Sequence, residues 1–511
     1  MRKLKNNLFT LALSVGFGLL APGCSDFFDV DPENGQEVEE YYQTVNDVNG
    51  AALGMYEPLA KNIHQLFLWG SARADMIQAG SGADVYVSEF VNNNVSVINP
   101  YTNYSFLYRC IARCNHHLEH LPDMKTNEYI TKSAMEVFYG EAHYLRALCY
   151  YYLVRTFKDV PLLLSDISEE VTYTNQQGEE VPMNTLDLSE EDLRAIALQP
   201  ASETKVWEAI VSDVNKAISL LRTNNAWFPP FGGDPEYTKY ARASLAAAYT
   251  LASEVSLWLG QYDRSSAMAE YVITYKSVGA GTNWASQFTG NGFGGYANFL
   301  LAYQYNQSME TNRMQEFTSN IKEDGGTYKV KPALDVVENI FSETKDVRRV
   351  SWMIINREPV VWKYIGKDDK GLSMRDAYQS DASWHVFKAI DGYLLKGIAE
   401  NRRGNPYGAL QYLNMIRRNR GLEEYKEEDI SLRMEDLEDR LFLERARETA
   451  FEGRRWYDLM LLEKMGRSGV LAKAVAQKYP EAQRDEIKTY LSDPAHWYLP
   501  IEPERWSKVD N

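Results

Sequence analysis

The residues with the clearest metal-binding spacing lie in segment 116–120, whose sequence HHLEH matches the His-x-x-Glu-His pattern of one class of zinc peptidases. On a helix, His116 and His120 share a face and can bind zinc, and Glu119 can act as the general base. A single helix rarely supplies four ligands, however. We therefore expect a structural helix with polar histidines and no metal ion, with a zinc site as the alternative.

The four cysteines are too few for a disulfide framework in a chain of 511 residues. Cys110, Cys114 and His117 are spaced to share one helix face, so a thiolate-rich cluster is conceivable there. One helical turn separates Cys110 from Cys114, and this geometry orients the pair poorly for a disulfide bond. We expect free thiols at both positions and a core position for Cys149, which lies in an apolar helical segment.

Other motifs that carry chemistry are weak or absent. Segment 29–40 is similar to an EF-hand calcium loop, but the sixth position, where the sharp turn needs glycine, is Asn34. The sequence holds no Gly-x-Ser-x-Gly, phosphate-loop or dinucleotide-binding motif. A glycosidase is defined by two carboxylates about 5–10 Å apart in space. The 71 acidic residues therefore leave a secreted hydrolase open as an alternative.

Segment 441–458 is densely charged and could be mistaken for an active site. Arg440 and Glu444 are spaced i, i+4, and Glu444 and Arg447 are spaced i, i+3, which predicts ion pairs on a helix surface. Trp456 can cover the guanidinium of a nearby arginine. We interpret the segment as structural rather than catalytic.

Three stretches without helical periodicity, 69–104, 227–233 and 279–312, are rich in aromatic residues. Surface loops seldom carry so many large rings unless the rings bury something. One face of a pyranose is apolar and its rim carries hydroxyl groups, so a sugar site needs a flat aromatic surface and a few hydrogen-bonding side chains. Our candidate ligand-binding residues are Trp284, Tyr296, Trp69, Arg73, Asp75, Asn93 and Tyr101. For each ring, the alternative is packing of a loop onto helices, and a structural ion pair is an equal alternative for Arg73 and Asp75.

Helices must position most of these residues. Apolar residues recur near i, i+3, i+4 and i+7 over most of the chain. This pattern predicts helices at 41–60, 103–121, 131–157, 205–222, 239–260, 263–276, 384–403, 406–419 and 434–464. Strand-like alternation is limited to 298–305 and 351–364. The sequence therefore predicts a mainly α protein.

Several of these helices are predicted to form antiparallel pairs. The stretch from Ala248 to Ala269 nearly reproduces the tetratricopeptide signature, in which small residues let two helices approach and Gly260 ends the first. Gly404 can close one helix in the left-handed conformation, and Pro406 can open the next. A further one or two hairpins are expected from 103–121 with 131–157, or from 131–157 with 205–222. A helix pair cannot bury its own apolar face, so the pairs must stack on each other.

Composition restricts the class of partner. Hydrophobic residues make up 45% and aromatic residues 13% of the chain, which is typical of a folded protein rather than a disordered one. The formal net charge is −17, and a nucleic-acid-binding protein needs a basic surface. We therefore expect no nucleic acid as a partner and a small or neutral ligand.

The N-terminus resembles that of an exported lipoprotein. Arg2, Lys3 and Lys5 precede an apolar run, Leu8 to Leu20, which is too short to span a bilayer and is typical of a signal peptide. The residues Ala21-Pro22-Gly23-Cys24 resemble a bacterial lipobox, which predicts cleavage before Cys24 and lipidation of its thiol. Acyl chains on Cys24 would hold the protein on a membrane essentially permanently.

Four longer motifs carry a resemblance that covers nearly the whole chain after Cys24. They are GEAHYLRALCYYYLVRTFKDVPLL (140–163), ARASLAAAYTLASEVSLWLGQYDRSSAMAEYVI (241–273), YLLKGIAENRRGNPYGALQYLNMIRRNRGL (393–422) and LFLERARETAFEGRRWYDLM (441–460). In this order they resemble the successive signatures of the SusD/RagB family. The resemblance implies four tetratricopeptide-like hairpins stacked in an α-α superhelix, with a loop-rich second region packed on them.

The same resemblance implies a function. It predicts an outer-membrane lipoprotein on the cell exterior that binds oligosaccharides non-catalytically, without a cofactor, and delivers them to a SusC-like TonB-dependent transporter. The alternatives are a peptide-capturing RagB-like protein, a secreted hydrolase, and a scaffold that binds proteins in its helical groove. We divide the chain into a signal peptide (1–23), a lipidated tether (24–40), a SusD-like N-terminal helical region (41–276) and a SusD/RagB C-terminal region (277–511) whose last helical hairpin is 384–420.

Overall fold

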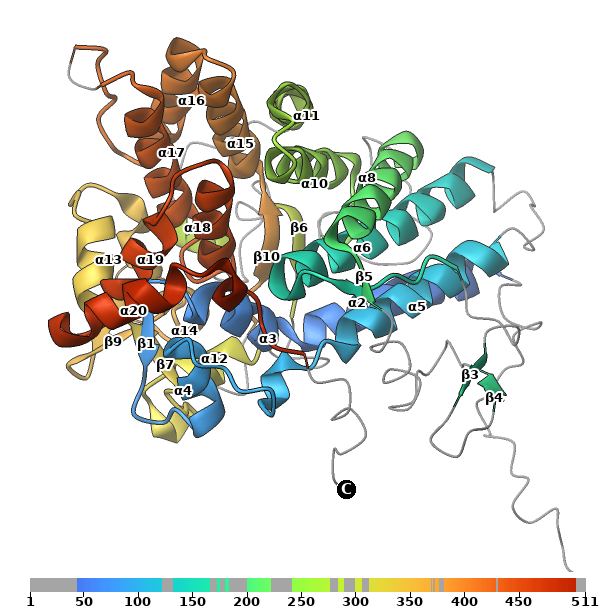
Figure 1. Cartoon of the computed structure of the whole chain (residues 1–511), viewed down its shortest axis with the longest axis horizontal. Coiled ribbons are helices and arrows are strands. Elements are labelled where there is room, and N and C mark those ends of the chain that lie inside the picture. Colours follow the sequence, from blue (N-terminus) through green and yellow to red (C-terminus); the bar gives the residue numbers. More distant parts are fainter. Residues whose placement is uncertain are drawn as a thin grey trace, which may run out of the picture.

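The computed structural model describes residues 44–121, 132–165, 172–174, 180–182, 200–221, 241–275, 284–288, 299–305, 312–368, 370, 373–375, 381–428 and 431–501. Within these ranges the chain is mainly helical and its strands are short, which confirms the predicted fold class (Figure 1). Within the same ranges, no helix combines the length and the apolarity needed to cross a membrane.

Helical hairpins form one side of the molecule, and consecutive pairs pack against each other in an arc (Figure 1). The first four long helices are α2 (Val45–Lys61), α5 (Ser105–His120), α6 (Lys132–Phe157) and α8 (Glu203–Leu220). The next four are α10 (Leu245–Trp258), α11 (Tyr262–Tyr275), α15 (Ala389–Arg402) and α16 (Pro406–Asn419). Helix α6 packs against both α5 and α8, so the two pairings proposed for 131–157 are both present.

Local sequence signals set the ends of these helices as expected. Gly260 has a φ of 67° in the α10–α11 turn and Gly404 a φ of 80° after α15, a backbone conformation that glycine adopts without steric cost. Pro406 occupies the first turn of α16, and the Asn405 side chain accepts a hydrogen bond from the Gly408 N–H at 3.0 Å.

The predicted helix 434–464 is wrong in one respect, because it is two helices. α17 (Met434–Glu448) and α18 (Arg455–Lys464) are separated by a turn in which Phe451 has a φ of 65° and Gly453 a φ of 70°. The turn frees two backbone carbonyls that buried side chains bind: Lys363 Nζ donates to the Ala450 oxygen at 2.9 Å, and Tyr364 Oη donates to the Phe451 oxygen at 2.7 Å. Two further helices, α19 (Val470–Ala476) and α20 (Arg484–Leu491), complete the C-terminal part.

Short strands join in antiparallel pairs beside the superhelix. β6 (Phe299–Tyr303) lies in the predicted strand 298–305 and pairs with β10 (Trp384–Lys388). The second partner corrects the sequence analysis, which began a helix at 384. Every residue of β10 is buried, so no alternation of apolar and polar residues marks it as a strand. The other pairs are β1 (Ile77–Ala79) with β7 (Val330–Pro332), β8 (Met353–Ile355) with β9 (Glu358–Val360), β2 (Val160–Pro161) with β5 (Pro200–Ala201), and β3 (Thr172–Thr174) with β4 (Glu180–Pro182).

Shorter helices pack against β1, β7, α17 and α18, on the side of the molecule away from β3 and β4 (Figure 1). They are α3 (Ile63–Phe67), the π-helical turn η2 (Leu68–Ala72), α4 (Val85–Val91), α12 (Met314–Thr318), α13 (Leu334–Ile340), α14 (Trp362–Ile365), and the 3₁₀ turns η6 (Trp284–Gln287) and η9 (Val347–Ser351). One large cluster of buried apolar side chains runs from α2 through the hairpins to α18 and α20. A single core therefore connects the superhelix to the region that carries the short strands.

Candidate ligand-binding pocket

Trp69, predicted to offer a ring to a ligand, lies instead in the core. Its side chain is 0% exposed, its Nε1 donates a hydrogen bond to the Tyr101 carbonyl at 2.7 Å, and its ring meets that of Phe157 edge-on at 5.3 Å. No ring face is left for a sugar, so the assignment of Trp69 to ligand binding is corrected to a structural role. Tyr101 remains partly exposed beside it and stays a proposal.

Arg73 and Asn93 are also buried structural residues. The Arg73 guanidinium lies 3.9 Å from the centroid of the Trp456 ring and donates to the carbonyls of Trp497 at 2.7 Å and His496 at 2.8 Å. Asn93 donates through Nδ2 to the Arg73 carbonyl at 2.9 Å. These bonds hold the C-terminal segment against the body of the protein. They occupy the polar groups that we had assigned to a ligand.

Asp75 forms a structural ion pair, which is the alternative that the sequence analysis left open for it. Its carboxylate accepts from Arg455 Nε at 3.0 Å and Nη2 at 2.7 Å, and its side chain is 4% exposed. The ion pair joins the start of α18 to the segment before β1. Tyr296 and the whole stretch 227–233 lie outside the described residues, as do Cys24, the tether 24–40 and the EF-hand-like segment 29–40.

Trp284 lies at the wall of an open pocket, but its ring is surrounded by cations. Its side chain is 2% exposed. Arg420 Cζ lies 5.1 Å, and Lys363 Nζ and Lys388 Nζ each 5.3 Å, from its ring centroid. These distances fit cation–π contacts. Trp284 therefore lies at the bottom of the pocket, and its ring is too covered to stack on a sugar.

The pocket has a volume of about 640 Å³ and opens to solvent. This volume lies in the range of about 300–1,000 Å³ that is typical of small-molecule sites. Its wall comes from η9, β8 and the residues before them, and its lining residues are Trp284, Thr344, Lys345, Asp346, Val347, Arg349, Val350, Trp352, Met353 and Ile354. Trp352 and Met353 are partly exposed and Ile354 is exposed, so apolar surface is accessible here.

Local sequence explains why this segment holds its shape. The Asp346 side chain caps η9 by accepting from the Arg348 N–H at 2.9 Å. The Arg348 guanidinium is fully buried and donates to Asp346 at 2.8 Å and to Glu444 of α17 at 2.6 Å. The segment is thus fastened to α17, while the side chain of the next residue, Arg349, lines the pocket.

Two indole N–H groups at the pocket have no hydrogen-bond partner among the described residues. The Nε1 atoms of Trp284 and Trp352 are both buried and unsatisfied. An unpaired buried donor costs on the order of 1–3 kcal/mol, and native proteins contain few of them. A ligand that brings acceptor oxygens into this pocket can satisfy such donors if the side chains shift slightly.

Beneath the pocket floor lies a buried network that joins α17 and the turn after it to the short strands. Glu452 accepts from Lys363 at 2.7 Å and from Lys388 at 2.8 Å. Burial raises the pKa of Glu452, but Lys363 and Lys388 outweigh this effect and hold it well below its usual range. Burial also lowers the pKa of Lys363 to about 8.

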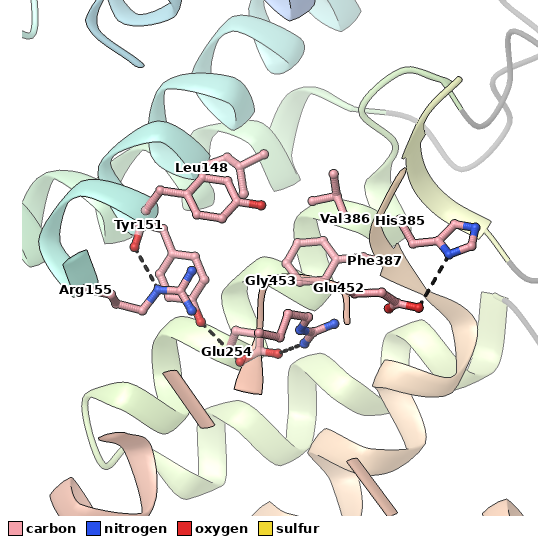
Figure 2. Close-up of a pocket in the computed structure, with 11 residues that line it drawn as sticks. Leu148, Tyr151, Arg155, Glu254, His385, Val386, Phe387, Glu452 and Gly453 are labelled. Carbon is pink, nitrogen blue, oxygen red and sulfur yellow. Dashed lines mark hydrogen bonds and ion pairs between the residues drawn. The ribbon is translucent and has the colours of Figure 1, made fainter. Parts of the chain in front are cut away.

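A second, much smaller cavity borders this network at Glu452 and His385 (Figure 2). Its volume of about 20 Å³ is enough for roughly one water molecule. His385 faces Glu452 on one side, with Nδ1 and Oε1 3.7 Å apart, and on the other side Tyr151 Oη donates to Glu254 at 3.2 Å (Figure 2). The cavity is too small for a saccharide, so we regard it as part of the support of the pocket.

Segment 441–458 is structural, as interpreted, but its ion pairs are not on a helix surface. Glu444, Arg445, Arg447 and Glu448 are at most 2% exposed. Arg445 binds Asp458 at 2.7 Å and, in α10, Glu254 at 2.6 Å. The predicted spacing of Arg447 and Glu444 does produce a pair, at 3.0 Å. Periodicity alone gave no sign that these charges face distant elements.

The histidine and cysteine motifs of α5, and Cys149 of α6, also lie in packed surroundings. Cys110, Cys114 and Cys149 are buried free thiols, and burial raises the pKa of each. The rings of His116 and His120 lie 4.2 Å apart. Among the described residues, no group of three or more histidine, cysteine, aspartate or glutamate side chains is arranged to hold a metal ion.

The sequence analysis did not select Trp352 or Arg349 as ligand residues. Trp352 was noted only as part of a strand-like pattern in 351–364. Residues 353–355 and 358–360 of that stretch do form β8 and β9, but its end is helical, because α14 begins at Trp362. Nothing in the local sequence distinguishes Arg349, which is partly exposed, from the buried Arg348 beside it.

Comparison with known proteins supports a family assignment. A family model described as "Starch-binding associating with outer membrane" matches residues 26–257, and one described as "SusD family" matches residues 292–511. SusD-like protein P38 of Formosa agariphila is 22% identical over 517 residues, which cover 91% of this chain and 93% of that protein.

The fold agrees with solved structures. A SusD superfamily protein from Bacteroides thetaiotaomicron has a TM-score of 0.70 at 19% identity, covering 91% of this chain and 96% of its own. A SusD-like protein described as laminarin binding has a TM-score of 0.65 at 20% identity, covering 91% and 97%. The two matching models, the full-length relatives and the shared superhelix together show that this chain belongs to the SusD/RagB family.

Proposed function

We propose that this protein captures oligosaccharides at the cell surface without cleaving them and delivers them to a SusC-like TonB-dependent transporter. The single observation that carries the proposal is the open pocket of about 640 Å³ with the partly exposed Trp352 on its wall. A relative of similar fold is described as laminarin binding, and a family model describes starch binding, which supports a saccharide ligand.

The pocket offers the two kinds of surface that a sugar requires. Trp352, Met353 and Ile354 supply apolar area, and burying roughly 100 Å² of it contributes at most about 2.5 kcal/mol. This gain alone does not overcome the entropy lost on association. With several hydrogen bonds from Thr344, Arg349 and the indole donors, we expect a Kd of order mM to μM. An affinity in this range permits capture followed by release.

The lining also supports binding without catalysis. Asp346 is the only acidic residue among the described residues that line the pocket, and Arg348 binds its carboxylate at 2.8 Å. Glycoside hydrolysis uses two carboxyl groups, one of which must donate a proton. An acid already held by an arginine is poorly suited to that role.

Lipid attachment at Cys24 and position on the cell exterior belong to the same proposal. The lipobox-like sequence before Cys24 supports attachment, and the family description places relatives at the outer membrane. We expect purification from the native outer membrane in mild detergent to co-isolate a SusC-like transporter.

A glycan array probed with the detergent-solubilised protein tests the function. We expect binding to a restricted set of oligosaccharides, and we expect mass spectrometry to recover the bound glycan intact after long incubation. Shorter products would show a hydrolase instead. Binding to a peptide panel and to no glycan would show a peptide-capturing protein.

A further inference from the structure

We propose that the pocket selects acidic oligosaccharides, whose sugars carry carboxylate or sulfate groups, over neutral ones. The inference rests on the proposed function of saccharide capture and names the ligand class of the same pocket. It also revises our expectation of a neutral ligand, which came from the net charge of −17 over the whole chain. The charge around the pocket is the opposite of that average.

The wall of the pocket carries accessible positive charge. Arg349 is partly exposed, and its side chain makes no ion pair or hydrogen bond with the described residues, unlike Arg348 beside it. Among the described residues, Lys345 pairs with Glu423 alone, at 3.1 Å, and both side chains are more than 70% exposed. Such exposed pairs contribute little to stability, so Lys345 can exchange Glu423 for a ligand anion.

No accessible carboxylate among the lining residues opposes these cations. Asp346 is the one acid in the lining, its side chain is 0% exposed, and Arg348 neutralises it. Below it, Glu448 is bound by both Arg348 and Arg420, and Glu444 by Arg348 and Arg417. These three buried acids are therefore already paired.

The floor adds further positive potential. Lys363 and Lys388 share the single carboxylate of Glu452, and both ammonium groups lie 5.3 Å from the Trp284 ring centroid. Burial keeps water from screening these charges, and their field extends to the pocket above.

The hydrogen-bonding groups also favour an acceptor-rich ligand. Arg349, Lys345 and the indole N–H groups of Trp284 and Trp352 can only donate hydrogen bonds. Carboxylate and sulfate oxygens only accept them, and charge-assisted bonds are roughly twice as strong as neutral ones. A neutral sugar hydroxyl can accept as well, but it gains nothing from the positive potential.

The test compares matched probes by isothermal titration of the full-length protein. The probes are uronic-acid trisaccharides of several linkages, their methyl esters, which keep the rings but lose the charge, and sulfated neutral trisaccharides. We expect at least one acidic probe to bind about tenfold or more tightly than its neutral counterpart. We expect high salt to weaken the acidic probe only, since salt screens exposed charges. The uronic-acid and sulfated arms identify which anion is preferred.

Arg349→Gln locates the effect in the pocket. We expect it to weaken the acidic probe about tenfold and the methyl ester by less than twofold. Arg264→Gln is the matched control, because Arg264 is a partly exposed arginine of α11 whose side chain donates to Asn215 at 2.6 Å; neither probe should respond to it. Equal binding of acid and ester, or an equal loss of both in Arg349→Gln, would overturn the inference.

If neutral saccharides alone bind and Trp352→Ala abolishes their binding, the proposed glycan capture is supported and the proposed selectivity for acidic sugars is contradicted. If no saccharide of either class binds, both the proposed function and the proposed selectivity are contradicted.

Discussion

Tryptophans that look alike in the sequence occupy different environments in the molecule. Trp69 is fully buried, whereas Trp352 is partly exposed at the pocket. Neither composition nor the spacing of nearby apolar residues tells them apart. Burial is decided by which distant elements cover a residue, here Phe106 and Phe157 over Trp69. The aromatic stretches could therefore be recognised from the sequence, but not which rings face outward.

Substitution of these two tryptophans tests their placement. We expect Trp69→Ala to lower the free energy of unfolding by about 3–5 kcal/mol, because it leaves a cavity in a packed core. Trp352→Ala should cost less than about 2 kcal/mol, because part of its ring is exposed already. Urea unfolding followed by circular dichroism measures both values. Equal losses would contradict the placement of Trp352.

Lys478 provides a pH-dependent test at one residue. It is buried, Nζ donates to the Ala72 carbonyl at 2.9 Å, and burial lowers its pKa to about 7. Because a lysine in the unfolded chain titrates near about 10.4, the unfolded state binds more protons between about pH 7 and 10. Stability therefore rises with pH across this window.

Lys478→Met removes that titration. We expect the variant to be more stable than the parent at about pH 6, by about 1–3 kcal/mol, with a smaller difference at about pH 9. Urea unfolding at both pH values gives the comparison. Lys473→Met, on the exposed face of α19, is the control and should show no such pH dependence. A variant that is less stable at both pH values would argue against the charged lysine as a cost to folding.

At the scale of elements, the helices and hairpins could be predicted from the sequence because they depend on local signals. Apolar spacing located the long helices, and Gly404 and Pro406 marked a helix boundary correctly. The break between α17 and α18 was missed because Phe451 adopts a left-handed backbone conformation, which is uncommon for a bulky residue and is therefore not predicted from the sequence. Strand β10 was missed because burial on both faces removes the alternating pattern.

The close approach of η2 to the turn before α18 gives a sharp prediction about these elements. A Cβ on Gly70 would lie 1.8 Å from the Gly453 carbonyl oxygen, closer than any real contact. We expect Gly70→Ala to prevent folding or to lower stability by more than about 3 kcal/mol. The yield of soluble protein and its thermal unfolding report the outcome.

Gly54→Ala is the matched control in helix α2, where an added Cβ would meet no atom within 4 Å. Alanine has the higher helix propensity, so this variant should be more stable by about 0.5–1 kcal/mol. If Gly70→Ala folds as well as Gly54→Ala, the two segments do not approach as described.

At the scale of the whole molecule, we expect the protein to be carried on a lipid anchor at Cys24. Cys24→Ser should abolish incorporation of labelled palmitate and release the protein from the membrane fraction, because the lipobox-like sequence then offers no thiol for acylation. Ser25→Ala, next to it, should keep the label. Labelling of the Cys24→Ser protein would place the attachment elsewhere.

The molecule as a whole also shows how far the sequence could lead. Four ordered motifs were enough to predict the family and its superhelix. The two matching family models confirm the family, and the packing of consecutive helices confirms the superhelix. The pocket was not predictable, because Trp284, Arg349 and Trp352 come together only when η6 packs against η9 and Arg348 fastens η9 to α17. Its ligand class depends on which charges remain unpaired after folding, and pairing between distant residues leaves no periodic signal.

The most direct test of the central claim is the affinity of the pocket for a saccharide. Isothermal titration of the full-length protein with the best glycan from the array should give a Kd in the mM to μM range. We expect Trp352→Ala to weaken it at least tenfold and Tyr407→Ala, an exposed ring on α16, to leave it unchanged. Unchanged binding in Trp352→Ala, or no glycan bound at all, would contradict the account.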